Sequence, residues 1–320
     1  QRRPGSAGDA FDLLCSIFRE RSADSADRRE LLTSLDPGVR AHLRSCLGLV
    51  SDPDHGLAPV KCLKSASQRV LGTTQHHTVF VCEDPLRPVL LMSPRIKATT
   101  SILFLHGLFQ SSTMVEQLAT ELLRELPHTR FIAPTAPSRS SVLGHGPSWC
   151  EDGRTECQQS ALHDSRVELL HVIRQEMSIG IAPDRVVLAG FAEGGNLATW
   201  IALQAPRKYA GLLLLSTAGH TGPQLGAKWP GAPQLQVLRC HGGLDTLVSD
   251  EAAKSNSKEL RALGCDVKHA HFNEAGHGVC VGMLQEIRAW LHECLPHAVG
   301  AQDVRVGVST QAQPSTRPAV

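Results

Sequence analysis

The sequence predicts an α/β protein in which helices cover both faces of a mostly parallel central sheet. Continuous apolar runs at residues 101–105, 186–188 and 212–215 have the length and composition of strands that are buried on both faces. Between such runs lie segments with apolar residues at helical spacing, for example residues 162–177. Strands that alternate with helices favour parallel pairing, because each helix carries the chain back across the sheet.

The composition of the 320 residues excludes several classes of function. Hydrophobic residues make up 42% of the chain but aromatic residues only 4%, so aliphatic side chains must fill the core. The net charge is +1 and the basic residues are dispersed, so we expect no nucleic-acid partner. Because no run of about 18 apolar residues occurs, we expect no stable membrane insertion.

The ten cysteines are scattered along the chain, and none forms a C-x-x-C pair. This spacing is more typical of reduced thiols than of a disulfide framework, although the framework is the alternative. We therefore expect a cytoplasmic protein.

Three regions are expected along the chain. Before residue 76, apolar side chains such as Phe11, Leu14 and Phe18 recur at helical spacing, so residues 1–75 are predicted to form a helical N-terminal extension. Its apolar stripes are interpreted as packing faces, with a site for an unknown partner as the alternative. Residues 76–296 are predicted to form the α/β domain, and the polar residues 297–320 a disordered tail.

Strands and helices are expected to alternate through the α/β domain. The first two strands are expected to form a hairpin around Asp84-Pro85, and the segment 135–160, rich in Ser, Gly and Pro, is expected to be a loop. Strands are predicted at residues 78–81, 89–92, 101–105, 131–134, 186–188, 212–215, 235–239 and 266–272, and helices at 113–126, 162–177, 250–263 and 281–295, with a further helix after Gly195.

The most informative stretch is Gly190-Phe191-Ala192-Glu193-Gly194-Gly195, which follows the strand at 186–188. A Gly-rich corner between a buried strand and a helix is typical of a nucleophile elbow, G-x-S-x-G, in which a sharp turn exposes a serine above the sheet. The nucleophile position here holds Ala192, whose methyl group cannot attack a carbonyl carbon. An ordinary strand–helix turn is the alternative interpretation.

Two further residues follow the elbow in the order expected for a catalytic triad, which is nucleophile, acid and histidine. Asp245 follows the strand at 235–239, and His277 follows the strand at 266–272. Asp245 would orient the imidazole of His277, and His277 would take the proton of the nucleophile. The backbone N–H groups of Leu108 and Glu193 would form the oxyanion hole.

At these residues the chain resembles the acyl-protein thioesterases, within the phospholipase/carboxylesterase group of α/β-hydrolases. The resemblance covers about residues 89–296. It rests on the following motifs: Phe104-Leu105-His106-Gly107-Leu108, Ala133-Pro134-Thr135-Ala136-Pro137, Pro147-Ser148-Trp149, Gly190-Phe191-x-x-Gly194-Gly195, Cys240-His241-Gly242-x-x-Asp245 and Gly276-His277. It implies an α/β-hydrolase fold and a hydrolase of ester or thioester bonds that needs no cofactor and no metal. The implied substrates are acylated proteins, at acyl-cysteine, or lipids such as lysophospholipid.

The chain departs from the pattern of this family at several positions. Ala192 and Glu193 stand where the family has Ser-Gln, and the Glu193 carboxylate would place negative charge near a developing oxyanion. Phe109 replaces a glycine, which matters if that position needs a positive φ. Gly243 and Thr246 replace Asp and Pro, and the loop at 139–147 lacks the apolar run of the family's acyl groove.

Other residues admit both a functional and a structural interpretation. We take Phe109 and Trp149 as candidate substrate-binding residues. His106 and His241 are interpreted as structural hydrogen-bonding residues, Cys240 as a packing thiol and Ser216 as a loop hydroxyl. The spacing of Cys150, Cys157 and His163 is too weak to predict a metal site.

Two functions therefore remain open. The first is an acyl-protein thioesterase-like esterase, which requires serine at position 192 and treats Ala192 as an engineered replacement or a sequence error. The second is a pseudoenzyme that binds acylated proteins or lipids without cleaving them. Loss of the nucleophile reduces turnover by about 10⁶ in serine proteases, so the two functions differ sharply in rate.

Overall fold

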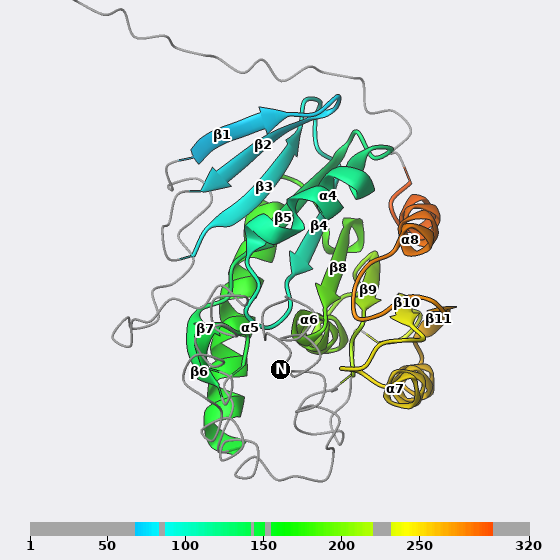
Figure 1. Cartoon of the computed structure of the whole chain (residues 1–320). Coiled ribbons are helices and arrows are strands. Elements are labelled where there is room, and N and C mark those ends of the chain that lie inside the picture. Colours follow the sequence, from blue (N-terminus) through cyan, green and yellow to red (C-terminus); the bar gives the residue numbers. More distant parts are fainter. Residues whose placement is uncertain (1–67, 83–86, 142–143, 151–154, 220–231, 297–320) are drawn as a thin grey trace, which may run out of the picture.

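The computed structural model describes residues 68–82, 87–141, 144–150, 155–219 and 232–296. In these residues a nine-stranded sheet forms the centre of the molecule, with strand order β1-β2-β3-β5-β4-β8-β9-β10-β11 (Figure 1). The pairings from β1 to β5 are antiparallel, and the five pairings from β5 to β11 are parallel. The predicted fold, a mostly parallel sheet flanked by helices, is confirmed.

The burial of the strands follows their position in the sheet. The central strands β4, β8 and β9 are apolar and almost wholly buried, as expected for strands covered on both faces. The edge strand β1 is exposed along its whole length. The strands are β1 (Gln68–Thr73), β2 (His77–Cys82), β3 (Val89–Pro94), β4 (Thr100–Leu105), β5 (Thr129–Pro134), β8 (Val186–Phe191), β9 (Gly211–Leu215), β10 (Gln236–Gly242) and β11 (Asp266–Phe272), and a separate hairpin comprises β6 (Ser138–Ser141) and β7 (Gly144–Pro147).

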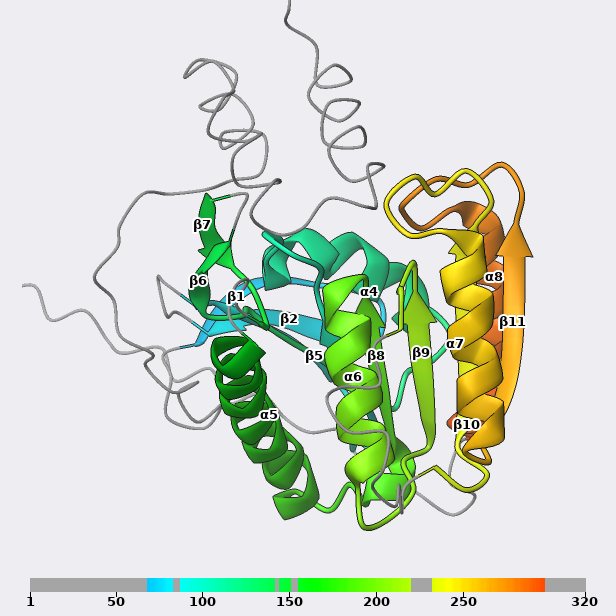
Figure 2. The ribbon, with the colours of Figure 1, turned by 90° about the horizontal axis from the view of Figure 1, so that it is seen from below.

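The helices cover the two faces of the sheet in two layers (Figure 2). On one face, α5, α6 and α7 pack over a core of mostly aliphatic side chains. On the opposite face, α4 and α8 pack over a second core. The helices are the 3₁₀ turn η1 (Ser112–Val115), α4 (Glu116–Leu123), α5 (Thr155–Ser178), the 3₁₀ turn η2 (Pro183–Arg185), α6 (Glu193–Gln204), α7 (Asp250–Ala262) and α8 (Val281–Cys294).

The structure corrects three local predictions. The strand β1 lies within the range expected for the helical extension, and its uniform exposure explains why no apolar pattern predicted it. The segment expected to be a loop contains the hairpin β6–β7, whose polar residues give no strand pattern. The helix expected at 113–126 begins as η1 and ends at Leu123. The rest of the N-terminal extension, Asp84-Pro85 and the tail lie outside the described residues.

Among the described residues, no helix combines the length and the apolar character needed to cross a bilayer.

Candidate functional site

The turn between β8 and α6 has the geometry of a nucleophile elbow. Its central residue, Ala192, has φ 48° and ψ −115°, a conformation that L-residues rarely adopt. The Ala192 N–H donates to the Leu215 carbonyl at 2.9 Å, and the Gly195 N–H donates to the Ala192 carbonyl at 3.2 Å. These bonds hold the strained residue between two neighbouring strands and the first turn of the helix.

The glycines around Ala192 permit this sharp turn. A Cβ atom on Gly190 would lie 2.4 Å from the backbone of Gly194, and one on Gly194 would lie 2.2 Å from the Leu105 carbonyl oxygen. Both contacts are with backbone atoms, so no side chain could move aside to relieve them. The glycines therefore bring α6 against β8 and β4, and the alternative of an ordinary turn does not account for the strained alanine.

The structure brings Asp245 and His277 together, although 32 positions separate them in the sequence. The Nδ1 atom of His277 lies 2.9 Å from Oδ2 and 3.1 Å from Oδ1 of Asp245. Since a carboxylate only accepts hydrogen bonds, His277 donates from Nδ1, and its Nε2 atom is left to accept a proton. Asp245 follows β10 and His277 follows β11, so both lie at the same edge of the sheet as Ala192.

Asp245 is held in its charged form by its surroundings. Its side chain is 0% exposed, and burial alone would raise its pKa. The hydrogen bond from His277 and the N–H groups of Val248 and Leu247 outweigh burial and hold the pKa of Asp245 below its usual value. A carboxylate that stays ionised stabilises a proton on the adjoining imidazole.

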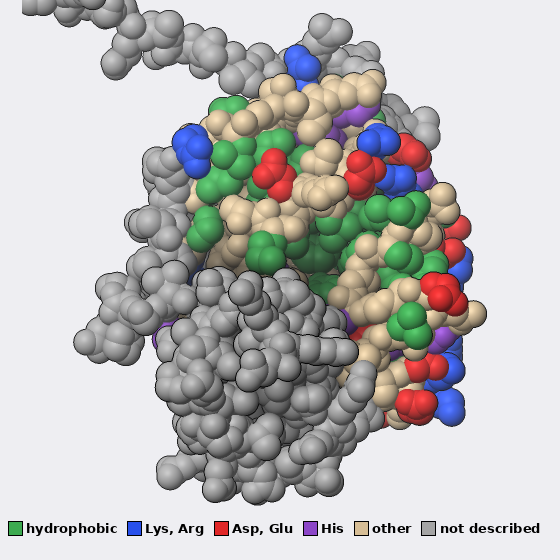
Figure 3. All heavy atoms as spheres, in the orientation of Figure 1, with side chains coloured by type: hydrophobic (Ala, Val, Ile, Leu, Met, Phe, Trp, Pro, Cys, Tyr) green, Lys and Arg blue, Asp and Glu red, His purple; other side chains and the backbone are tan. Residues whose placement is uncertain are grey.

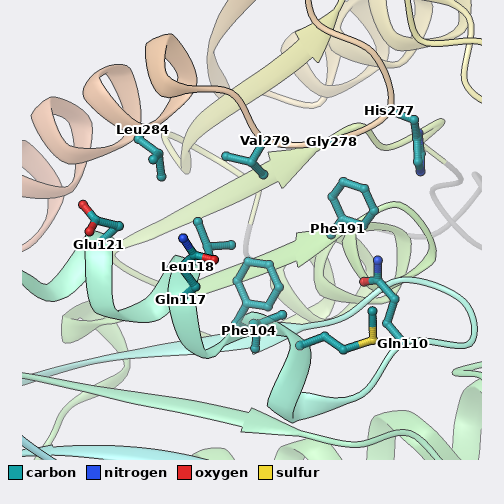
Figure 4. A pocket seen from close by; sticks show the side chains of 12 residues that line it. Phe104, Gln110, Gln117, Leu118, Glu121, Phe191, His277, Gly278, Val279 and Leu284 are labelled. Atoms are coloured by element: carbon teal, nitrogen blue, oxygen red, sulfur yellow. The ribbon is translucent and has the colours of Figure 1, made fainter. Parts of the chain in front are cut away.

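A cavity of about 400 Å³ lies beside His277. Phe191 forms the wall next to the imidazole. The Phe191 and His277 rings meet edge to face, with their centroids 4.8 Å apart. In Figure 4, His277 lies at one end of the cavity and Glu121 at the other. Figure 3 shows hydrophobic side chains around a hollow on this face of the molecule. The other apolar lining residues are Phe104, Met114, Val115, Leu118, Val279 and Leu284.

No motif in the sequence predicts this cavity. Its walls include η1 with α4 and the start of α8, and more than 150 residues separate α4 from α8 in the chain. Leu118 and Leu284 have the helical spacing of ordinary packing residues, so their pattern carries no signal of a cavity.

Glu193 is the first residue of α6, where a backbone N–H has no acceptor within the helix. Its side chain accepts hydrogen bonds at Oε1 from the Ser148 hydroxyl at 2.7 Å and from the Cys150 N–H at 3.0 Å. Its other oxygen is buried without a hydrogen-bond partner among the described residues. Burial raises the pKa of Glu193 despite these bonds. The carboxyl group is thus bound to the segment after β7.

The structure places neither candidate substrate-binding residue in contact with the cavity. Trp149 is 1% exposed and donates from Nε1 to the His106 carbonyl at 2.8 Å, so it packs beneath the site. Phe109 is 6% exposed, and its N–H donates to the Pro147 carbonyl at 2.8 Å. Its φ of 59° shows that the position does require the left-handed region. Both side chains are buried, and Leu108 lies in the same turn as Phe109.

The structural interpretation of the other candidates agrees with their burial. His106 is fully buried, its Nε2 accepts the Ala136 N–H, and burial lowers its pKa to about 4. His241 is fully buried and bonds the Val248 carbonyl. Burial raises the pKa of Cys240 to about 12, so its thiol stays protonated. Ser216 is fully buried, and the side chain of Cys157 lies outside the described residues.

Known proteins of similar sequence include acyl-protein thioesterases from fungi. Acyl-protein thioesterase 1 of Neurospora crassa is 28% identical over 229 residues, which cover 66% of this chain and 93% of that protein. Acyl-protein thioesterase 1 of Mycosarcoma maydis is 28% identical over 233 residues, which cover 65% of this chain and 97% of that protein.

Solved structures share the fold. Arabidopsis thaliana SOBER1 matches with a TM-score of 0.54 at 24% identity, over 61% of this chain and 99% of that one. Zea mays acyl-protein thioesterase 2 matches with a TM-score of 0.55 at 22% identity, over 65% and 98%. The phospholipase/carboxylesterase family model matches residues 89–295, which hold the elbow, Asp245 and His277. The chain therefore belongs to the phospholipase/carboxylesterase family of α/β-hydrolases.

Proposed function

We propose that this protein binds the acyl group of ester or thioester ligands, on acylated proteins or lipids, and does not cleave them through a covalent acyl-enzyme. Its site keeps the elbow turn and the hydrogen-bonded pair of Asp245 and His277. The atom that would attack the carbonyl carbon is missing at Ala192. In this account the relatives' thioesterase activity is replaced by recognition of the same kind of bond.

One observation carries this proposal: Ala192 occupies the strained apex of the elbow, with φ 48° and ψ −115°. At this apex, serine would be the nucleophile of the family mechanism, and His277 would accept its proton. An alanine side chain has no proton to give and no lone pair to attack with. The neighbouring candidates do not replace it, because Cys240 and Ser216 are fully buried.

The cavity beside His277 supports an apolar ligand. Its walls are mostly aliphatic and aromatic side chains, and its volume of about 400 Å³ lies within the usual range for small-ligand sites. With His277 at one end, an acyl chain in the cavity would present its carbonyl carbon to the elbow. Each methylene group buried in the cavity would add about 0.8 kcal/mol to the binding free energy, so chain length would set the affinity.

The absence of disulfides among the described cysteines supports a reducing compartment. Cys82, Cys240 and Cys265 form no disulfide among the described residues. We propose a cytoplasmic location on this ground.

The substitution Ala192→Ser tests the proposal. We expect a serine-reactive fluorophosphonate to label Ala192→Ser and to leave the unaltered protein unlabelled. We also expect Ala192→Ser to hydrolyse a short-chain ester faster, by up to about 10⁶-fold, because loss of a catalytic serine has an effect of this order in serine proteases.

The double variant Ala192→Ser/His277→Ala is the matched control, since it has the hydroxyl but no base. The fluorophosphonate should label this double variant far more slowly than Ala192→Ser, and the double variant should hydrolyse the ester far more slowly. The proposal fails if the unaltered protein hydrolyses the ester as fast as Ala192→Ser. A folded Ala192→Ser protein that is never labelled would implicate the oxyanion loop and would favour binding without cleavage.

A second candidate function is slow hydrolysis by water. The intact pair of Asp245 and His277 favours it, because His277 could take a proton from a water molecule in place of serine. Proteases without a triad member keep a rate about 10³–10⁴ above that in water. If this function applies, His277→Ala in the otherwise unaltered chain abolishes the residual turnover.

A further inference from the structure

A cluster of possible metal ligands lies apart from the elbow, between the start of α7 and the edge strand β11. Asp250 is the first residue of α7, while His269 and His271 are two residues apart on β11 and so lie on the same face of the strand. One ligand atom from each of the three residues lies within 4.8 Å of the other two. None of the three side chains takes part in the hydrogen bonds around Ala192 or Asp245.

The hydrogen bonds of His269 leave one ring nitrogen free to bind a ligand. The Ser257 hydroxyl donates its only proton to the Ala253 carbonyl at 3.0 Å, so it accepts a hydrogen bond from Nδ1 of His269 at 3.1 Å. The proton of the neutral ring is therefore on Nδ1, and Nε2 carries a lone pair. That Nε2 atom is buried and has no hydrogen-bond partner among the described residues.

This arrangement is the one that proteins use to prepare a histidine for a metal ion. The ring nitrogen that does not bind the metal donates to a second residue, which fixes the tautomer and the ring orientation. A buried nitrogen lone pair without a donor is otherwise unfavourable, because burial removes its hydrogen bond to water. A cation would satisfy it.

The other two ligands complete a site with three protein atoms. Nδ1 of His271 lies 3.2 Å from Oδ1 of Asp250. Two ligands that bind Zn²⁺ tetrahedrally at about 2.0–2.1 Å lie roughly 3.3 Å apart, so this pair already has the required separation. The side chain of His271 is 32% exposed, so the cluster is open to solvent on that side. Lys254 holds only the other carboxylate oxygen, Oδ2, and is 59% exposed.

We propose that Asp250, His269 and His271 bind a divalent transition-metal ion, with Zn²⁺ as the best match for two imidazoles and one carboxylate. The partly exposed His271 leaves a fourth position open to water or to another ligand. The ion would join the start of α7 to β11, beside the segment from Asp245 to Ser249. This inference is independent of the proposed function, because it concerns different residues and a different ligand.

Competition with a chromophoric zinc chelator tests the site on the full chain. We expect the unaltered protein to take up one more Zn²⁺ than the triple variant Asp250→Asn/His269→Gln/His271→Gln. Each single substitution should weaken this uptake at least 10-fold. Ser257→Ala should also weaken zinc uptake by about 10-fold or more, because it removes the acceptor that keeps the proton of His269 on Nδ1.

His292→Gln is the control. His292 is 46% exposed and pairs with Glu125, just after α4. This variant should bind zinc as the unaltered protein does. All ten cysteines remain in every variant, so zinc bound by thiols is the same throughout. Zn²⁺ should also raise the unfolding midpoint of the unaltered protein and of the control, but not that of Asp250→Asn or His271→Gln.

The proposal is overturned if the unaltered protein takes up no more zinc than the triple variant. It is also overturned if Asp250→Asn and His271→Gln, each with a normal unfolding midpoint in the absence of metal, bind zinc as tightly as His292→Gln. Asp250 and His271 are partly exposed, so these two substitutions keep the test independent of any effect of His269 on folding.

Discussion

At the scale of single residues, the site has the backbone geometry of a nucleophile elbow with an alanine at its apex. Ala192 keeps the strained backbone of an elbow but lacks the hydroxyl group that such strain normally presents to a substrate. Phe109 has φ 59°, in the left-handed region that favours glycine, and its side chain is buried. Both residues hold a backbone conformation that L-residues rarely adopt, at the two turns that border the site.

Glu193 gives a prediction about pH. Burial raises its pKa, so the folded state binds its proton more tightly than the unfolded state does. The resulting stabilisation is present below the usual carboxyl pKa and is lost as the pH rises through the raised value. We expect Glu193→Gln to increase the free energy of unfolding at pH 7 by about 1 kcal/mol, because it removes a buried charge.

Chemical denaturation between pH 4 and pH 8 measures this effect. The difference between Glu193→Gln and the unaltered protein should shrink toward pH 4, where the carboxyl group is protonated in both states. Glu251→Gln, an exposed substitution in the first turn of α7, is the control and should show little change with pH. A constant difference at all pH values would contradict the assignment of a raised pKa to Glu193.

At the scale of secondary-structure elements, the site depends on how η1 with α4 meets the start of α8. Leu118 of α4 and Leu284 of α8 face the same cavity, and Arg288 of α8 ties the two helices by donating to the Glu121 carboxylate at 2.5 Å. The helices thus form a fixed wall beside His277. The shape of the cavity, rather than the elbow, would select the length of an acyl chain.

A pair of substitutions on α8 tests this role. Leu284→Asp places a charge in the cavity wall, and we expect it to weaken binding of a non-hydrolysable octyl ketone analogue about 10-fold. Val281→Asp is the matched control, because Val281 is on the same helix but is 73% exposed and does not line the cavity. Calorimetric titration measures both affinities.

The contrast between the two α8 variants shows whether the acyl chain lies in this cavity. Neither substitution should change the weak binding of a methyl ketone analogue, which has no chain to bury. Equal losses of octyl ketone binding in Leu284→Asp and Val281→Asp would show that the acyl chain lies elsewhere.

At the scale of the whole molecule, the parallel part of the sheet assembles the site. Ala192, Asp245 and His277 follow β8, β10 and β11, and the carboxyl ends of parallel strands lie at one edge. This topology could be predicted from the sequence, because the central strands β4, β8 and β9 are apolar runs that alternate with helical segments, and each candidate residue lies in the turn after a predicted strand. The pairing of Asp245 with His277 was predicted on the same ground.

Other features depend on contacts that no local pattern encodes. The exposed strand β1 and the polar hairpin β6–β7 lack the alternation that marks a half-buried strand. Trp149 is buried and donates a hydrogen bond to the His106 carbonyl, more than 40 positions earlier, a contact that no local pattern predicts. The cavity arises only where distant helices meet, and the cluster around His269 arises from the packing of α7 against its neighbouring strand β11.

The most direct test of the account is to recover the ligand after binding. The unaltered protein, in excess, is mixed with a labelled octanoyl thioester, the complex is separated from free ligand, and the bound label is identified by chromatography. We predict saturable binding and recovery of the intact thioester. Recovery of free octanoic acid at the rate given by Ala192→Ser, or the absence of binding, would contradict the account.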